Sequence, residues 1–248
     1  MDNEKKPFLE TKDIYKSFGH VQALRGVSMN AYEGEVLALV GDNGAGKSTL
    51  IKILSGVLHP DKGTIRIGEK EYQGLTPKKA IEAGVSTVYQ DLALGNTMDV
   101  ASNLFLGNEL TKSGFLQKKK MNEEAKRILE DLDIQIPAVT VPVGNLSGGQ
   151  RQGVAVARLV HNGGKLLIFD EPTAAMGLNE SNAVLKLIKR LAKEGFTVIV
   201  ISHNLPHVFH MSNRICVMRQ GQVIRELLTE ETTMDEVVSM ITGAITTD

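Results

Sequence analysis

The chain has 248 residues, 42% hydrophobic and 23% charged, which is enough for one folded domain, or for one domain with a subdomain. Its apolar runs fall well short of the roughly 18 residues that a membrane-spanning helix needs, and residues 1–7 lack the pattern of a secretory signal. A formal net charge of -1, without a dense basic tract, argues against a general nucleic-acid surface. We therefore expect a folded protein that does not cross a bilayer by itself.

Four apolar segments predict the strands of a buried parallel sheet. Each runs into a polar residue or a glycine, and they are residues 36–40, 85–89, 166–169 and 197–201. Continuous apolar runs suit parallel strands that helices cover on both faces, and we predict helices at 48–54 and 181–193. Ligands of such sheets bind beyond the carboxyl ends of the strands. The residues that follow all four strands should therefore meet at one site.

Other segments predict smaller elements around this sheet. Val27, Met29 and Ala31 alternate with polar or small neighbours, which indicates a half-buried antiparallel layer. Residues 215–218 and 223–224 bracket Gln220-Gly221 as a hairpin, and a short helix is expected at 234–241. The single cysteine, Cys216, lies in the apolar stretch of this hairpin and is expected to be a buried thiol.

The middle of the chain, residues 92–160, has a helical rather than a strand-forming pattern. Asn122 is a fair N-cap for a helix, and the basic residues 118–120 are expected to form a solvated loop before it. An apolar stripe on this helix is formed by Ile128, Leu129 and Leu132. We therefore predict a helical insertion between sheet strands.

Residues 41–48 read Gly-Asp-Asn-Gly-Ala-Gly-Lys-Ser, between a predicted strand and a predicted helix. The glycines let backbone N–H groups face a phosphate chain, and the helix adds its positive N-terminal end. Lys47 would place its charge on the β and γ phosphates, and the Ser48 hydroxyl could bind Mg²⁺. The alternative is a tight strand-to-helix turn with a solvated lysine. The predicted nucleotide-binding residues here are Gly41, Asp42, Asn43, Gly44, Ala45, Gly46, Lys47, Ser48 and Thr49.

Polar side chains follow the other three strands. Asp170 and Glu171 end one strand, where one carboxylate could hold Mg²⁺ and the other could orient an attacking water. Gln90 could contact the metal or that water, and His203 could hydrogen-bond a γ-phosphate oxygen. Taken singly, a glutamine, a histidine or an Asp-Glu pair at a strand end has no function in many proteins, but the shared edge favours a site.

Residues 146–150 read Leu-Ser-Gly-Gly-Gln and begin a predicted helix. Ser147 and Gln150 have the spacing of a capping box, which explains these two residues structurally. Gly148 and Gly149 lower helix stability by about 1 kcal/mol each relative to alanine, so a structural helix start does not explain them. A helix start with bare N–H groups is an anion site, and we interpret the segment as a phosphate receptor.

In this order, the five motifs resemble the nucleotide-binding domain of ATP-binding cassette (ABC) transporters, over residues 8–241. The Leu-Ser-Gly-Gly-Gln signature separates that family from other P-loop ATPases. The resemblance implies an α/β P-loop NTPase fold with a mainly parallel core sheet, a flanking antiparallel β subdomain and a helical signature subdomain. Residues 1–90 and 161–248 would form the core with its antiparallel layer, and residues 91–160 the helical subdomain.

The resemblance also implies roles for residues. Phe18 would stack on adenine, although as an isolated aromatic residue it would be interpreted as core. ATP and Mg²⁺ would be bound, with Ser48, Gln90 and Asp170 at the metal. The catalytic residues would be Glu171, His203, Gln90 and Lys47. Two copies of the chain would sandwich two ATP molecules head to tail, and the residues facing the partner's ATP would be Ser147, Gly148, Gly149 and Gln150.

Residues 170–178 resemble ATPases of bacterial monosaccharide importers, such as those for ribose, xylose, galactose or fructose. This implies permease partners that dock near residues 91–106, an indirect link to a solute-binding protein, and a peripheral location at the cytoplasmic face of the membrane. We expect no extra C-terminal regulatory domain and no nucleic-acid partner. The sequence departs from the family at Gly177, usually an aspartate that crosses the dimer interface, and at Gly153, often an arginine.

Three other functions fit parts of the pattern. The chain could serve an importer of another solute, because this subunit would not touch the cargo. A soluble cassette ATPase acting on nucleic acid or ribosomes usually has a second cassette, a coiled coil or strong basic patches, which this sequence lacks. A module that binds nucleotide without hydrolysis is opposed by a complete set of catalytic and metal-binding residues, namely Lys47, Ser48, Gln90, Asp170, Glu171 and His203.

Overall fold

The structure is a computed structural model that describes residues 6–174 and 176–244. The chain divides into two compact units. The first comprises Met1–Thr87, Lys165–Glu171 and Ile188–Asp248, and the second comprises Val88–Gly164 and Pro172–Leu187. The second unit thus includes the predicted helical segment and also residues 172–187, which come after the strand that ends at Asp170.

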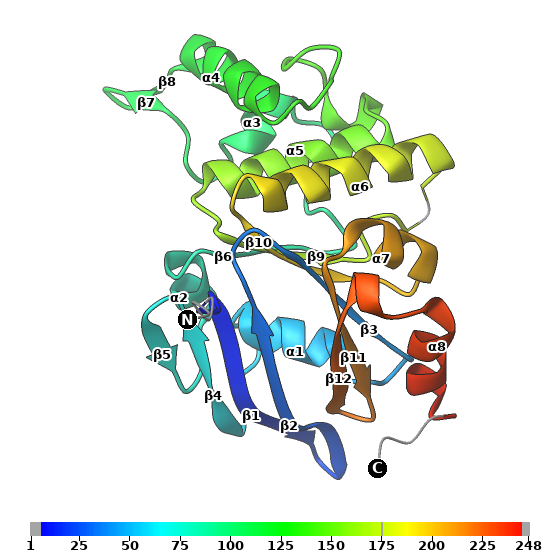
Figure 1. Cartoon of the computed structure of the whole chain (residues 1–248). Helices are drawn as coiled ribbons and strands as arrows, with labels where there is room; N and C mark the ends of the chain where they lie inside the picture. The colour runs from blue at the N-terminus through cyan, green and yellow to red at the C-terminus, as the bar shows by residue number, and fades with distance from the viewer. Residues whose placement is uncertain (1–5, 175, 245–248) are drawn as a thin grey trace. The chain divides into compact units, whose positions relative to one another are not determined.

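The main sheet has the strand order β12-β11-β3-β10-β9-β6 (Figure 1). Its strands β11, β3, β10 and β9 are parallel, whereas β12 returns antiparallel to β11 as the predicted hairpin. Buried apolar side chains predominate in β3, β9 and β10, which confirms the predicted parallel sheet. The bounds are β3 (Val36–Gly41), β6 (Val85–Val88), β9 (Leu166–Asp170), β10 (Thr197–Ile201), β11 (Arg214–Arg219) and β12 (Gln222–Leu228).

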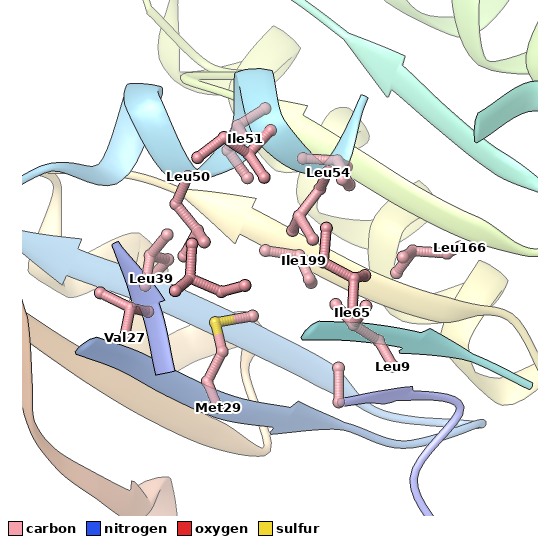
Figure 2. Close-up of a cluster of buried hydrophobic side chains, with 14 of the residues drawn as sticks. Leu9, Val27, Met29, Leu39, Leu50, Ile51, Leu54, Ile65, Leu166 and Ile199 are labelled. Atoms are coloured by element: carbon pink, nitrogen blue, oxygen red, sulfur yellow. The ribbon is translucent and has the colours of Figure 1, made fainter. Parts of the chain in front are cut away.

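An antiparallel sheet with the order β2-β1-β4-β5 lies beside it, as predicted. Val27, Met29 and Ala31 on β2 are buried, as their alternation predicts. Helix α1 (Lys47–Leu54) lies between the two sheets, and its Leu50 and Leu54 point into their shared core (Figure 2). The strands are β1 (Leu9–Phe18), β2 (Val21–Ala31), β4 (Lys62–Ile67) and β5 (Lys70–Tyr72).

The other helices that lie wholly in the first unit are short, and side-chain caps begin α2, α7 and α8. Thr76, Asn204 and Thr233 each accept a hydrogen bond from the backbone three residues on, so each begins a helix. Cys216 is buried in β11, as predicted. These elements are α2 (Pro77–Glu82), α7 (Leu205–Met211), η2 (Thr229–Glu231) and α8 (Met234–Thr242).

The second unit is mainly helical. It contains α3 (Val100–Leu104), α4 (Lys118–Asp131), η1 (Val143–Asn145) and α5 (Gly148–His161), with the small hairpin β7 (Thr111–Lys112) and β8 (Phe115–Leu116). Helix α6 (Leu178–Lys193) begins in this unit and ends in the first. Within the described residues, no helix is long and apolar enough to span a membrane.

Two predictions about α4 are wrong. The helix begins at Lys118 with Gln117 as N-cap, so residues 118–120 form its exposed first turn rather than a loop, and Asn122 lies inside the helix. The reason is Met121, which is buried with Ala125 and Leu129 at helical spacing. Burial of this residue extends the helix by one turn beyond the cap that local sequence favours.

Candidate active site

The glycine-rich loop joins β3 to α1, and two of its glycines cannot be replaced without displacing backbone. At Gly41, with φ at 154°, an added Cβ would lie 2.2 Å from the Met218 carbonyl oxygen. At Gly46, the N-cap of α1 with φ at 102°, it would lie 2.7 Å from the Ala23 carbonyl oxygen. Only glycine fits both the conformation and the space. The loop is therefore held between neighbouring strands in a curled form.

Lys47 folds back over this loop. Its Nζ donates hydrogen bonds to the carbonyl oxygens of Gly41, at 2.7 Å, and Asp42, at 3.0 Å. Burial lowers the pKa of Lys47, and the negative charges of Glu171, Asp42 and Asp170 oppose that shift. The ammonium thus stands at the mouth of the loop with neutral oxygens as its direct partners. Anionic phosphate oxygens would form stronger, charge-assisted bonds.

The two predicted carboxylates lie at the carboxyl end of β9. Asp170 is the last strand residue and pairs in register with Ile201 of β10. Glu171 adopts a left-handed conformation with φ at 53°, and its N–H donates to the Ile201 carbonyl oxygen at 3.0 Å. A non-glycine residue in this region carries strain of about 1–3 kcal/mol and persists where the surroundings impose it. The kink breaks the strand alternation that would send the two side chains to opposite faces.

Glu171 meets the histidine predicted beyond the neighbouring strand. Its Oε1 lies 2.7 Å from His203 Nδ1. The histidine side chain is 77% exposed and the glutamate side chain 19% exposed. The imidazole ring of the pair is therefore open to solvent, whereas the carboxylate is mostly covered.

Asp170 and Ser48 supply oxygen atoms suited to a hard cation. Burial is the main cause that raises the Asp170 pKa, Glu171 adds to it, and Lys47 and Lys52 oppose it. The Ser48 hydroxyl is on an exposed residue in the first turn of α1. Carboxylate and hydroxyl oxygens are the donors that Mg²⁺ prefers, so these residues fit that ion.

Phe18 is not a core residue. Its side chain is 48% exposed at the end of β1, where it pairs with Val21. Lys16 Nζ lies 5.7 Å from the ring centroid, at cation–π distance. An exposed ring leaves area free for stacking, so the core interpretation is wrong.

The second unit contains the signature segment. Ser147 Oγ accepts from the Gln150 N–H at 3.3 Å, and Gln150 Oε1 accepts from the Ser147 N–H at 3.1 Å, which confirms the capping box. Gln150 Nε2 also donates to the Gln135 carbonyl oxygen. Added Cβ atoms at Gly148 and Gly149 would lie 3.5 Å from Glu180 of α6. These are ordinary contact distances, so packing against α6 does not require glycine at either position, and the bare N–H groups remain the explanation for both.

Gln90 is exposed after β6 and belongs to the second unit, whereas the glycine loop, the carboxylates and His203 belong to the first. Two residues that the sequence did not single out hold the segment after Gln90. Arg158 on α5 donates to the carbonyl oxygens of Leu92, at 3.2 Å, and Ala93, at 3.0 Å.

Asn103 on α3 is the second of these residues. It is fully buried, accepts from the Gly95 N–H at 2.8 Å, and donates to the carbonyl oxygens of Gly95, Met98 and Asp99. A buried asparagine in an apolar run is the signal that could have indicated it, because such a side chain needs partners.

Gly153 and Gly177, the two departures from the family pattern, differ in their surroundings. An added Cβ at Gly153 would lie 2.7 Å from Ile134 Cγ2, so the packing of Ile134 onto α5 requires a residue without a side chain. Gly177 is exposed, with open space around it. The glycine at 153 is thus explained by packing, and the one at 177 is not.

A glycine loop on a central parallel strand, with an Asp-Glu pair and a histidine after neighbouring strands, defines a P-loop ATPase. A family model described as ABC transporter matches residues 24–174. The chain is 47% identical over 235 residues to the xylose/arabinose import ATP-binding protein of Sulfolobus acidocaldarius, with 95% of this chain and 94% of that protein covered. It is 42% identical over 247 residues to the fructose import ATP-binding protein of Rhizobium meliloti, with 96% and 95% covered.

Solved structures agree. A nucleotide-free ATP-binding cassette from an ABC transporter superposes with a TM-score of 0.83 at 29% identity, covering 95% of this chain and 98% of that one. A dimeric cassette bound to ADP and phosphate gives 0.74 at 25% identity, covering 89% and 98%. The chain belongs to the ABC transporter family, as an ATPase cassette. The predicted family, α/β fold and enzyme class are thereby confirmed.

Proposed function

We propose that this chain hydrolyses MgATP to energise import of a monosaccharide through partner permeases. The observation that carries the proposal is the contact of 2.7 Å between His203 and Glu171 beside the glycine loop. A site that only bound nucleotide would not need a carboxylate held by a second polar group. The names of two relatives, both sugar import ATP-binding proteins, support the cargo class.

In this proposal each residue of the first unit has one task. The loop N–H groups and Lys47 bind the β and γ phosphates, and Ser48 and Asp170 hold Mg²⁺, which neutralises charge that develops on the phosphates. Glu171 accepts a hydrogen bond from the attacking water through the oxygen that His203 leaves free. His203, with its exposed ring, contacts a γ-phosphate oxygen. Gln90 would contact the metal or the attacking water, as predicted from the sequence.

The adenine would stack on Phe18, whose exposed ring lies on the same unit as the glycine loop. Stacking of one aromatic ring on another contributes about 0.5–1.5 kcal/mol beyond area burial. The remaining affinity would come from the phosphates. Base identity would therefore matter less than the triphosphate.

The signature segment completes the site of a second copy. Ser147 and the N–H groups of Gly148 and Gly149 would bind the γ-phosphate held by the partner's glycine loop. The similar cassette crystallised as a dimer with ADP and phosphate supports this assembly. Because ATP would bind the closed dimer better than the open one, hydrolysis would release the dimer.

The permease would dock on residues 91–106 of the second unit, at the cytoplasmic face of the membrane. Arg158 and Asn103 support this role, because they hold residues 92–99 in one conformation from α5 and α3. A docking segment fixed to the signature helix would pass a movement of the permease to Ser147. A solute-binding protein would deliver the sugar without touching this chain.

The test is Glu171→Gln, which keeps the size of the side chain and removes its charge. We expect ATP binding to persist, turnover to fall by about 100-fold or more, and an ATP-dependent dimer to elute in size-exclusion chromatography. Lys47→Ala provides the matched control, because it should lose binding and dimer together. A monomer at saturating ATP, or undiminished turnover of Glu171→Gln, would refute the proposal.

The cargo requires a different experiment. Membrane proteins that copurify with the tagged chain from its native cells would be identified by mass spectrometry. A permease encoded beside a periplasmic or surface sugar-binding protein is the expected result. Recovery of ribosomes or nucleic acid instead would support the soluble cassette alternative.

A further inference from the structure

The small hairpin β7–β8 of the second unit is ordered but exposes two large apolar side chains. Its strands pair Thr111 with Leu116 and Lys112 with Phe115. Ser113 and Gly114 both have positive φ, at 52° and 81°, as in the tight turn that matches the twist of a hairpin. The Gln117 N–H donates to the Leu110 carbonyl oxygen at 2.8 Å and closes its base. The hairpin is therefore a fixed feature, and its two apolar side chains lie on β8.

Phe115 is 79% exposed and Leu116 is 62% exposed. Neighbouring residues of a strand point to opposite faces, so the hairpin presents an apolar side chain on each face. It projects away from α3 and α4 of its own unit (Figure 1). A protein groove would cover one face of a hairpin, whereas a lipid phase surrounds both.

The hairpin and the first turn of α4, which follows it, carry positive charge. Residues 110–122 contain no aspartate or glutamate, in a chain whose formal net charge is -1. The charged residues of this segment are Lys112, Lys118, Lys119 and Lys120, all exposed. Lys118 forms an ion pair of 3.0 Å with Asp99. The other three lysines are exposed and lie before and after Phe115 and Leu116 in the chain.

We propose that this hairpin inserts Phe115 and Leu116 between the headgroups of a membrane surface rich in anionic lipid. Exposed apolar residues beside basic side chains are the pattern of interfacial membrane binding, in which apolar burial and attraction to anionic lipid act together. This proposal depends on the proposed function only because that function places the chain at a membrane. Lipid contact by the hairpin would fix the second unit near the bilayer independently of the permease.

The experiment uses the absence of tryptophan from the sequence. Phe115→Trp then reports on one position in the full chain. Vesicles of phosphatidylglycerol and phosphatidylcholine in equal parts should shift its emission to the blue, and brominated acyl chains should quench it. Ile81→Trp is the control, because Ile81 is a similarly exposed residue, at 61%, on α2 of the first unit, and its emission should not change.

Charge and insertion are then separated. Replacing Lys112, Lys119 and Lys120 by glutamine in the Phe115→Trp chain should weaken vesicle binding by about fivefold for each lysine. Replacing Phe115 and Leu116 by serine should abolish cosedimentation while ATPase turnover without vesicles is unchanged, which shows that the chain is folded.

Three results would overturn the proposal. The first is a Phe115→Trp emission spectrum that vesicles do not shift, and the second is an equal shift for Ile81→Trp. The third is a shift that appears only when the vesicles contain the permease, which would mean that Phe115 and Leu116 bind a protein groove. The Glu171→Gln chain should bind these vesicles as wild type does. Failure of lipid binding can therefore be told apart from failure of the hydrolysis proposal.

Discussion

Arg158 is a strong test of how the second unit is held together. Its guanidinium reaches from α5 to the carbonyl oxygens of Leu92 and Ala93, more than sixty residues earlier in the chain. Ala93 has positive φ, at 47°, so the segment it belongs to is bent at the point of contact. Burial lowers the Arg158 pKa, which shows a guanidinium partly withdrawn from water. Arg158→Met keeps the length of the side chain and removes both hydrogen bonds.

The expected loss follows from these contacts. A hydrogen bond from a charged donor contributes about 1.5–3 kcal/mol net, so two would contribute at least about 3 kcal/mol. Part of that gain is offset because the methionine variant no longer desolvates a charge, and because the site is partly exposed. We expect the free energy of unfolding to fall by about 2 kcal/mol. Arg158→Lys, which can reach one carbonyl, should lose about half as much.

Urea unfolding followed by circular dichroism measures this change, with Arg151→Met on the same helix as the control. That variant should change the free energy of unfolding by less than about 0.5 kcal/mol, because the Arg151 side chain makes no hydrogen bond to the residues that the structure describes. Hydrogen exchange adds a local readout, since amides of residues 92–95 should exchange faster in Arg158→Met. An unfolding midpoint equal to that of wild type, with unchanged exchange, would refute the reasoning.

Three further predictions concern Lys47 of the glycine-rich loop, the packing of α5 and the partly buried carboxyl group of Glu226. Lys47→Ala should reduce steady-state phosphate release by about 100-fold or more, and a near-normal rate would remove Lys47 from the phosphates. Gly153→Ala should lower the free energy of unfolding by about 1–2 kcal/mol despite a better helix propensity, because of the contact with Ile134. Adding Ile134→Ala should recover that part of the loss. Burial raises the pKa of Glu226 above its ordinary value of 4.5, against the opposing charge of Arg214. Folded protein therefore holds this proton more tightly than unfolded protein. Its contribution to stability is complete below pH 4.5 and is lost as pH rises through the folded pKa. As pH rises over that range, the unfolding free energy of wild type should therefore fall relative to that of Glu226→Gln. A difference that stays constant with pH would contradict the raised pKa of Glu226.

The sheet and the loop could be predicted because their signals are local. Apolar runs define β3, β9 and β10, and the glycine-rich loop is recognised from residues 41–48 alone. The capping box of α5 needs only Ser147 and Gln150, three residues apart. Each of these features is decided within a few positions, so the sequence alone carries it.

Features that depend on distant partners could not be predicted. Cap preference alone predicts that α4 begins at Asn122, yet the burial of Met121 decides where it begins. The left-handed backbone of Glu171 depends on its bond to Ile201, and the role of Arg158 depends on carbonyl groups near residue 92. Neither position has a local pattern that requires such a contact. The roles assigned to all nucleotide-binding, metal-binding and catalytic residues remain predictions, including those of Gln90 and Phe18.

The strand order also has a consequence for synthesis. The sheet neighbours of β3 are β10 and β11, which lie more than 150 residues later in the chain, after the whole second unit. When residues 100–161 have left the ribosome, their helices can already pack locally. At that stage β3 has neither β10 nor β11 to pair with. Long-range strand pairing is slow, and unpaired apolar strands attract chaperones or aggregate. A stalled chain ending before residue 197 should therefore protect its helical segment from proteolysis but leave β3 open to cleavage.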